Sequence, residues 1–295
     1  MRPRLAGRGA GDGYACVSGN YTFGNATLAL NGTGVGIAMG GNKTDVNGTG
    51  MNDTWAIVTR ATTIVREPVT NPPPFNETIY PASTWRVNPE GKYSINETTG
   101  ALTMVLRHSL IPATSGRYEG VATTLGWSRR VGFGKVRAEM DVGGVASGVV
   151  GAMVIAAPEG DEIDFEWVGA NTSQVWTNWF RSGIPEYGRG MAHEIPGVDK
   201  GGSHEYGIEW TEDLIRWSVD SVPVRTIYRV QYPRPDPPYD GGWLFPTRRG
   251  DVEIGVWDGG SSNEGTREWA GGFVDWGDAG QEYWVKVGWV KVECW

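Results

Sequence analysis

Glu162-Ile163-Asp164-Phe165-Glu166 is the stretch of this chain that says most about its fold. Three carboxylates alternate there with two large apolar residues, which is the period of a β-strand. On a strand the three acids point to one face, while Ile163 and Phe165 point to the other and enter a core. A helix would separate the acids, because residues i and i+2 do not share a helix face. The stretch therefore predicts a half-buried strand with an acidic face.

Three carboxylates this close cannot all ionise freely, so we expect at least one raised pKa. A protonated carboxyl beside an ionised one is the pair that glycoside hydrolysis uses. The Cα atoms of Glu162 and Glu166 would lie about 13 Å apart on a strand. A retaining mechanism needs carboxyl groups about 5–5.5 Å apart, so the two side chains would lean together on a concave strand. Asp164 lies between them and can hydrogen-bond Glu162.

Two plainer interpretations compete with this one. Alternating acids are often only a solvated strand face, and clustered carboxylates also suit calcium. The neighbouring run 149–157 is apolar, and Trp167 and Val168 follow the acids. These neighbours favour a functional site over a polar surface. The sequence shows no calcium-ligand loop, so we expect no metal and no cofactor.

The composition limits the classes of molecule that the protein can bind. The net charge of −8 argues against nucleic acid, whereas a neutral polysaccharide is compatible with it. The 15 tryptophans offer flat rings that can stack on sugars, although tryptophan also fills cores. No stretch is long enough to span a membrane, and we expect a monomer.

Glycosylation motifs indicate the compartment. N-x-S/T sequons are dense before residue 100, which predicts a secreted, glycosylated protein. They occur at Asn20, Asn25, Asn31, Asn42, Asn47, Asn52, Asn76, Asn96 and Asn171. Cys16 and Cys294 lie near the two ends and either form one disulfide or remain two thiols. Within this sequence we identify neither a signal peptide nor a lipid-anchor tail.

The chain divides into two parts. Residues 1–75 are rich in Gly, Asn and Thr, and we expect a glycosylated N-terminal extension with a few edge strands. From residue 76 to 295 short strands follow one another, with a short helix or loop at 264–275. We expect strands at 93–96, 102–106, 120–127, 134–142, 149–155, 162–166, 174–180, 205–210, 214–219, 222–228, 252–257 and 283–293. Many short strands without long helices predict an all-β fold, a two-sheet β-sandwich of jelly-roll type.

The stretch DEIDFEWVG at 161–169 resembles the catalytic strand of glycoside hydrolase family 16. Further stretches resemble one branch of that family, the fungal Crh-type cell-wall transglycosylases. These are TNWF (177–180), HEY (204–206), IEW (208–210), WSVD (217–220), GVWDGG (255–260), EWAGG (268–272) and DW (275–276). The resemblance covers roughly residues 90–295.

The resemblance implies a jelly roll with a concave substrate cleft, and a reaction by double displacement. It implies Glu162 as nucleophile, Asp164 as its helper and Glu166 as acid/base. A chitin-type donor would be cut and transferred to β-glucan or chitin in the cell wall. Substrate-binding positions implied by the matching motifs, or by their place beside the acids, are Asn178, Trp179, Trp257 and Trp269.

Other functions remain open at this point. The nearest alternative is an endo-β-1,3(4)-glucanase, a hydrolase that would share the catalytic strand. A catalytically inactive carbohydrate-binding wall protein is a second, although three crowded acids serve no purpose in a binder. A structural wall glycoprotein is a third, supported only by the sequons. No chitin-binding module or Ser/Thr-rich tail is visible, and residues 1–75 resemble no family known to us.

Overall fold

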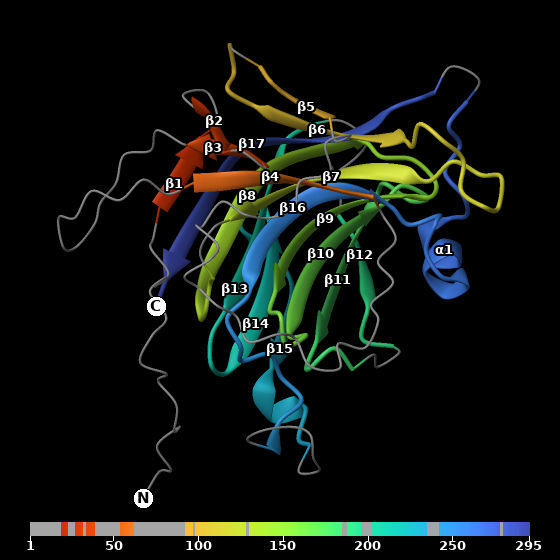
Figure 1. Ribbon diagram of the computed structural model, residues 1–295. Coiled ribbons are helices and arrows are strands. Elements are labelled where there is room, and N and C mark those ends of the chain that lie inside the picture. The colour runs from red at the N-terminus through yellow and green to blue at the C-terminus, as the bar shows by residue number, and fades with distance from the viewer. Residues whose placement is uncertain are drawn as a thin grey trace, which may run out of the picture.

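A computed structural model of the chain shows a two-sheet antiparallel sandwich, which confirms the predicted all-β fold (Figure 1). It describes the backbone of residues 19–22, 27–31, 34–38 and 54–61. From 92 to 295 it describes all residues except 97, 128–129, 185–187, 196–201, 235–241 and 278–279. No helix in these parts of the chain is long and apolar enough to cross a membrane.

One sheet contains the acidic strand. Its strands, in spatial order, are β2 (Thr27–Asn31), β3 (Gly34–Ala38), β4 (Thr54–Ala61), β7 (Gly120–Trp127), β16 (Asp251–Asp258), β9 (Val149–Ala156), β10 (Glu162–Val168), β11 (Gln174–Phe180) and β12 (Met191–Glu194). The acidic stretch forms β10, as predicted. Four-residue β12 was not predicted, and it extends this sheet beyond β11.

The second sheet packs behind the first. Its order is β5 (Lys92–Ile95), β6 (Leu102–His108), β17 (Tyr283–Cys294), β8 (Gly134–Gly144), β13 (His204–Trp210), β14 (Leu214–Val219) and β15 (Val222–Tyr228). The strand β1 (Gly19–Thr22) pairs with the far part of β17. The end of β6 also pairs with β7 and joins the two sheets. The short elements are η1 (Arg229–Gln231) and α1 (Glu264–Ala270).

Strands from the N-terminal part belong to both sheets. β1 pairs with β17 of the second sheet, and β4 lies between β3 and β7 of the first, so β4 is not an edge strand. The domain boundary predicted at residue 75 lies outside the described residues and stays a prediction.

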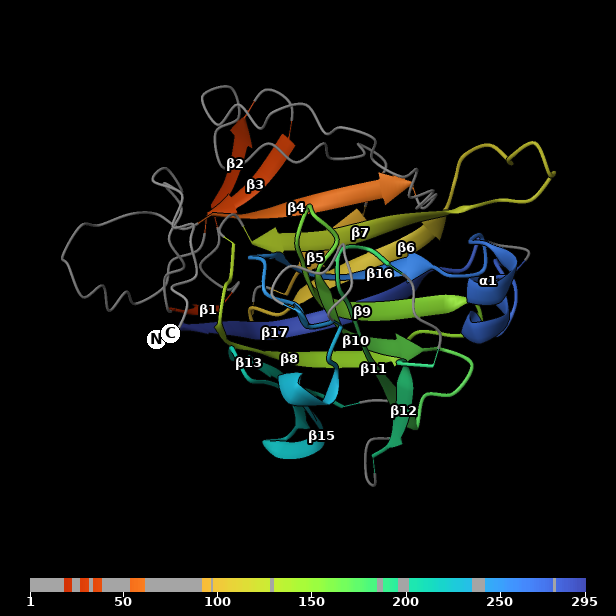
Figure 2. The ribbon, with the colours of Figure 1, turned by 90° about the horizontal axis from the view of Figure 1, so that it is seen from below.

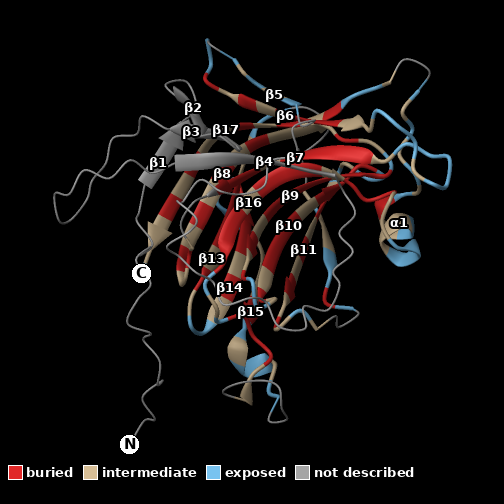
Figure 3. Ribbon diagram, viewed as in Figure 1, coloured by how far each residue is buried: buried red, intermediate tan, exposed pale blue. Residues whose placement is uncertain are grey.

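The core lies between the two sheets, where the buried residues concentrate in the central strands (Figure 3). From β10, Ile163 and Phe165 point into it and are 1% and 0% exposed. Trp167 joins them, and its ring lies edge-on to Tyr206 of β13 with centroids 4.5 Å apart. The apolar half of β10 therefore packs against the second sheet, and its acids must face away from that sheet.

The helix α1 is docked firmly at one end of the acidic sheet (Figures 1 and 2). Its N-terminus is capped by Asn263, whose side chain accepts a hydrogen bond from the Thr266 backbone N–H at 3.1 Å. Its C-terminus is capped by Gly271 at φ 94°. A Cβ at Gly271 would lie 2.5 Å from the Ala170 side chain, so the cap packs tightly on the β10–β11 loop.

A hydrogen bond from the second sheet holds the middle of β10. The indole N–H of Trp217, on β14, donates to the backbone carbonyl of Asp164 at 2.9 Å. Trp217 is fully buried. Because a buried hydrogen bond cannot be replaced by water, this contact fixes β10 relative to the opposite sheet.

We expect Trp217→Phe to lower the free energy of unfolding by about 1–3 kcal/mol, from the lost hydrogen bond and the smaller ring. It should also lower the rate of any reaction at the acids, because their strand loses an anchor. Urea unfolding and steady-state rates measure the two effects.

Trp210→Phe is the matched control. Trp210 is equally buried, but its indole N–H donates to the Pro246 carbonyl at 3.2 Å and not to a residue of β10. It should cost similar stability and leave the rate of the folded protein closer to that of the parent. Equal rate losses in the two variants would contradict a specific role for Trp217.

Candidate active site

The three acids of β10 share one side of their sheet, which we name the acid face. Glu162, Asp164 and Glu166 lie there because β10 alternates regularly and its apolar residues occupy the core. Their cross-strand neighbours on the same face are Ala156, Val154 and Ala152 of β9 and Phe180, Asn178 and Trp176 of β11. The β9 neighbours are small or medium-sized, which leaves room above the acids on that side.

Glu166 has a strongly altered acidity. Burial raises its pKa to about 8, and the negative charge of Glu162 adds to the rise. Glu166 as a whole is partly exposed to solvent. Its carboxyl group is enclosed by its neighbours, which disfavours the charged form. At neutral pH Glu166 therefore keeps its proton, on the same face as the Glu162 carboxyl. The predicted raised pKa is present, and it belongs to Glu166.

Asp164 is the most buried of the three acids, at 3% exposed. It lies between Glu162 and Glu166 along the strand, with its backbone carbonyl held by Trp217. Its place and burial suit a group that orients a neighbouring carboxylate rather than one that meets solvent.

Two further acids lie on the acid face and were not predicted. Asp251 and Glu253 of β16 stand opposite Ala156 and Val154 of β9. Burial raises the pKa of Asp251 to about 6, partly offset by Arg130, whose Nε lies 3.6 Å from the carboxylate. Their spacing of two residues on a strand was the signal that could have found them.

Three tryptophans gather beside Glu166. Trp257 of β16 and Trp269 of α1 lie nearly parallel, with ring centroids 6.4 Å apart and planes at 27°. Trp176 meets Trp269 edge-on, at 5.8 Å and 83°. All three are partly exposed. The sequence led us to Trp257 and Trp269 but not to Trp176, although Trp176 precedes Asn178 by two residues and so shares its face.

Asn178 lies on the acid face opposite Asp164, where we expected it. Its side-chain oxygen accepts a hydrogen bond from the Trp179 backbone N–H at 2.9 Å. The amide NH₂ group is therefore what Asn178 can offer to a substrate hydroxyl.

The prediction that Trp179 binds substrate is wrong. Trp179 is 0% exposed and points into the core, edge-on to Tyr232 with centroids 4.8 Å apart. The guanidinium of Arg189 covers its ring at 4.2 Å. The physical reason is strand alternation: Asn178 and Trp179 are adjacent, so only one of them can reach the acid face.

The start of β10 is held by a buried carboxylate, Asp161, which is 2% exposed. It pairs with the guanidinium of Arg181 and accepts backbone N–H groups from Ser182, Thr247 and Arg248 at 2.8–3.0 Å. This network ties two loops to the residue that precedes Glu162. No local sequence signal pointed to it, because its partners lie 20 to 87 positions away.

The remaining site predictions concern cysteines and metals. Cys294, at the end of β17, is disulfide-bonded. Cys16 lies outside the described residues, so the Cys16–Cys294 pairing stays a prediction. Among the residues that the structure describes, no cluster of three or more His, Cys, Asp or Glu side chains has a geometry suited to a metal ion.

Several curated fungal proteins are similar to this chain. A Crh-like protein of Arthroderma benhamiae is 37% identical over 147 residues, which cover 49% of this chain and 38% of that protein. Congo red hypersensitive protein 2 of Saccharomyces cerevisiae is 32% identical over 170 residues, covering 56% and 34%. The chain thus spans little more than a third of the length of these relatives.

Solved structures share the fold. Crh5 transglycosylase in complex with NAG has a TM-score of 0.56 and 30% identity, covering 70% of this chain and 77% of that one. The β-glucanase of Bacillus licheniformis has a TM-score of 0.57 and covers 94% and 98%, but at 17% identity it shows the fold alone.

The sequence profile of glycosyl hydrolases family 16 matches residues 82–277, about two thirds of the chain and all of β10. The resemblance inferred from the acidic stretch and the Trp-rich motifs is thereby confirmed, and the chain belongs to glycosyl hydrolases family 16.

Proposed function

We propose that this protein is a retaining glycosidase and transglycosylase of a polysaccharide cell wall. The observation that carries the proposal is the pair Glu162 and Glu166, which share one face while the Glu166 pKa stands at about 8. One carboxyl is ready to give a proton and the other to attack, as retaining catalysis requires. Family membership and the Crh-like relatives support it.

In the first step Glu166 donates its proton to the glycosidic oxygen while a Glu162 oxygen attacks the anomeric carbon. The bond to the leaving sugar breaks and a glycosyl ester forms on Glu162. In the second step Glu166, now a carboxylate, takes the proton from an incoming hydroxyl. That oxygen attacks the anomeric carbon, and Glu162 leaves as a carboxylate.

Asp164 acts on Glu162 rather than on the sugar. It lies next to Glu162 on the acid face and is nearly inaccessible to solvent. A carboxyl there can share a proton with Glu162, which orients the nucleophile and stabilises it as a leaving group in the second step.

The tryptophan corner favours transfer over hydrolysis. The incoming hydroxyl must reach Glu166, and Trp176 stands opposite Glu166 on β11. Its ring is nearly perpendicular to that of Trp269, which lies nearly parallel to that of Trp257, and these three rings form the tryptophan corner. A pyranose can stack on one ring and touch the edge of another, which holds an acceptor sugar and displaces water.

We take the donor to be a chitin-type chain and the acceptor to be β-glucan or chitin. The likeness to Crh5 transglycosylase in complex with NAG supports this choice. The sequons and the disulfide at Cys294 support secretion, because disulfides persist in oxidising compartments. An endo-β-1,3(4)-glucanase would use the same acids. Its products would be shorter glucan fragments, whereas a transglycosylase gives products longer than the acceptor. The raised Glu166 pKa argues against an inactive binding protein.

We expect kcat/KM to fall as pH rises through about 8, tenfold per unit above it, because Glu166 must be protonated for the first step. The sign follows from the raised pKa: below pH 8 the proton is present, and above pH 8 it is lost. A profile of kcat/KM against pH, measured on a natural glycan, shows this fall above pH 8. Glycosides with activated aryl leaving groups need no proton and should not show it. A natural-substrate profile that stays flat from pH 7 to 10 would contradict the assignment.

The proposed function is tested by measuring the transfer of a sugar chain from donor to acceptor. Mixed with chitin oligosaccharides and a fluorescent β-glucan or chitin oligosaccharide, the protein should yield labelled products longer than the acceptor. Glu162→Gln should lower turnover by about a thousandfold or more while the fold survives. Trp176→Ala should lower the ratio of transfer to hydrolysis several-fold, because water gains access to the intermediate.

Trp289→Ala is the control for Trp176, since Trp289 is a partly exposed tryptophan on the second sheet. It should leave the transfer ratio unchanged. Short chitin fragments without labelled transfer would favour the hydrolase, and full activity in Glu162→Gln would refute the catalytic assignment.

A further inference from the structure

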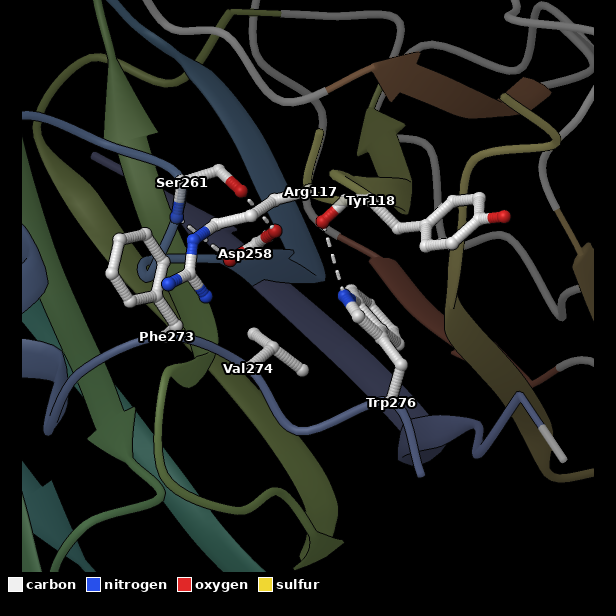
Figure 4. Close-up of a pocket in the computed structure, with 7 residues that line it drawn as sticks. All are labelled: Arg117, Tyr118, Asp258, Ser261, Phe273, Val274 and Trp276. Atoms are coloured by element: carbon white, nitrogen blue, oxygen red, sulfur yellow. Dashed lines mark hydrogen bonds between the residues drawn. The ribbon is translucent and has the colours of Figure 1, made fainter. Parts of the chain in front are cut away.

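A small cavity of about 140 Å³ opens at the α1 end of the sandwich, apart from the acid face (Figure 4). Its lining comes from three places far apart in the sequence: the segment before β7, the end of β16 with the loop after it, and the segment between α1 and β17. The seven lining residues are Arg117, Tyr118, Asp258, Ser261, Phe273, Val274 and Trp276. None of them belongs to the acid face.

One side of the cavity is rigid. Asp258 is 1% exposed and accepts hydrogen bonds from the Gly120 backbone N–H at 2.8 Å and the Ser261 backbone N–H at 2.9 Å. The Ser261 hydroxyl donates to the same carboxylate at 2.5 Å. These bonds tie the start of β7 to the loop after β16. Asp258 is therefore structural, and the Ser261 oxygen remains able to accept a hydrogen bond.

The other side is aromatic and open to solvent. Phe273 is 45% exposed, among the most exposed large rings of the described residues. The indole N–H of Trp276 donates to the Tyr118 carbonyl at 3.2 Å, which fixes the indole ring against the segment before β7 (Figure 4). The Tyr118 ring points away from the other lining side chains, so Phe273 and Trp276 are the two rings that line the opening (Figure 4). Two aromatic side chains at one opening suit the apolar face of a ligand.

A cation stands at the same opening. The guanidinium of Arg117 lies 3.9 Å from the centroid of the Phe273 ring, and that of Arg267 lies 4.8 Å from it. Neither guanidinium has a carboxylate partner among the residues that the structure describes. Arg117 lines the cavity, so its N–H groups are available to a ligand there.

We propose that this cavity, which we name the end pocket, binds one sugar unit of a β-linked polysaccharide. A pyranose presents an apolar C–H face and a rim of hydroxyls. The aromatic rings match the face, and the Arg117 guanidinium and Ser261 oxygen match the rim. The cavity is smaller than the roughly 300–1,000 Å³ of a drug-sized site, so it holds a single unit. The choice of polysaccharide rests on the proposed function.

A second sugar-binding site would change how strongly the protein binds a polymer. When one part of a chain is held in the end pocket, other segments of that chain reach the acid face at a raised effective concentration. Short oligosaccharides gain nothing from this, because they cannot occupy both sites. The end pocket should therefore matter for polymers alone.

The test uses the full chain with Glu162→Gln, which binds without turnover. It is titrated with β-1,3-glucan and chitin oligosaccharides while indole N–H signals are followed by NMR. We expect the Trp276 signal to move in a saturable way, separately from those of Trp176 and Trp269. Adding Arg117→Ala and Phe273→Ala should weaken the Trp276 response at least tenfold and change the acid-face response less than twofold.

Leu110→Ala is the matched control, because Leu110 is 68% exposed on the same β6–β7 segment and does not line the cavity. It should leave both responses unchanged. In the active protein, the Arg117→Ala/Phe273→Ala pair should lower the rate on insoluble polysaccharide several-fold and keep kcat/KM on short oligosaccharides.

The outcomes separate this proposal from the proposed function. Movement of acid-face signals without Trp276 overturns the end pocket alone. Movement of Trp276 without acid-face signals supports the pocket and counts against the proposed substrates. Binding of inorganic phosphate to the pocket without any oligosaccharide response, or equal losses in Leu110→Ala, also overturns it.

Discussion

The rest of the site depends on the burial of one side of β10. Ile163, Phe165 and Trp167 are packed against the second sheet, and their burial leaves the strand no freedom of register. A slip of one residue would place three carboxylates in the core, at a cost that no packing gain could offset. The acids are therefore held together on the opposite face despite their mutual repulsion. The burial of the Glu166 carboxyl, with a smaller contribution from the charge of Glu162, raises the Glu166 pKa and keeps its proton in place at neutral pH.

Long-range contacts give this arrangement its rigidity. Trp217 reaches from the opposite sheet to the Asp164 carbonyl, and Asp161 draws two distant loops to the start of the strand. Helix α1 is fixed by its glycine cap against the β10–β11 loop, and it brings Trp269 to Trp176 and Trp257. Catalysis by two carboxyl groups needs such fixed positions, because small displacements of either group lower the rate.

The sequence predicted what depends on local alternation and missed what depends on distant partners. Strand positions and the shared face of Glu162, Asp164 and Glu166 follow from period-two patterns, and the structure agrees with them. The error at Trp179 came from giving the same role to two adjacent residues, Asn178 and Trp179, whose side chains point to opposite faces of a strand. Trp176 is the ring that shares the face of Asn178. The Asp161 network could not be predicted, because its members meet only after folding. The same holds for the end pocket, where Tyr118 and Trp276 lie 158 positions apart.

The most direct test of the catalytic assignment is to trap the glycosyl ester. The protein is incubated with a fluorinated chitin-type glycoside bearing an activated leaving group, which slows the second step, and digested for peptide mass spectrometry. We expect one glycosyl adduct per protein on the side chain of Glu162, and none in Glu162→Gln. An adduct on another residue, or a first product of inverted anomeric configuration, would contradict a double displacement through Glu162.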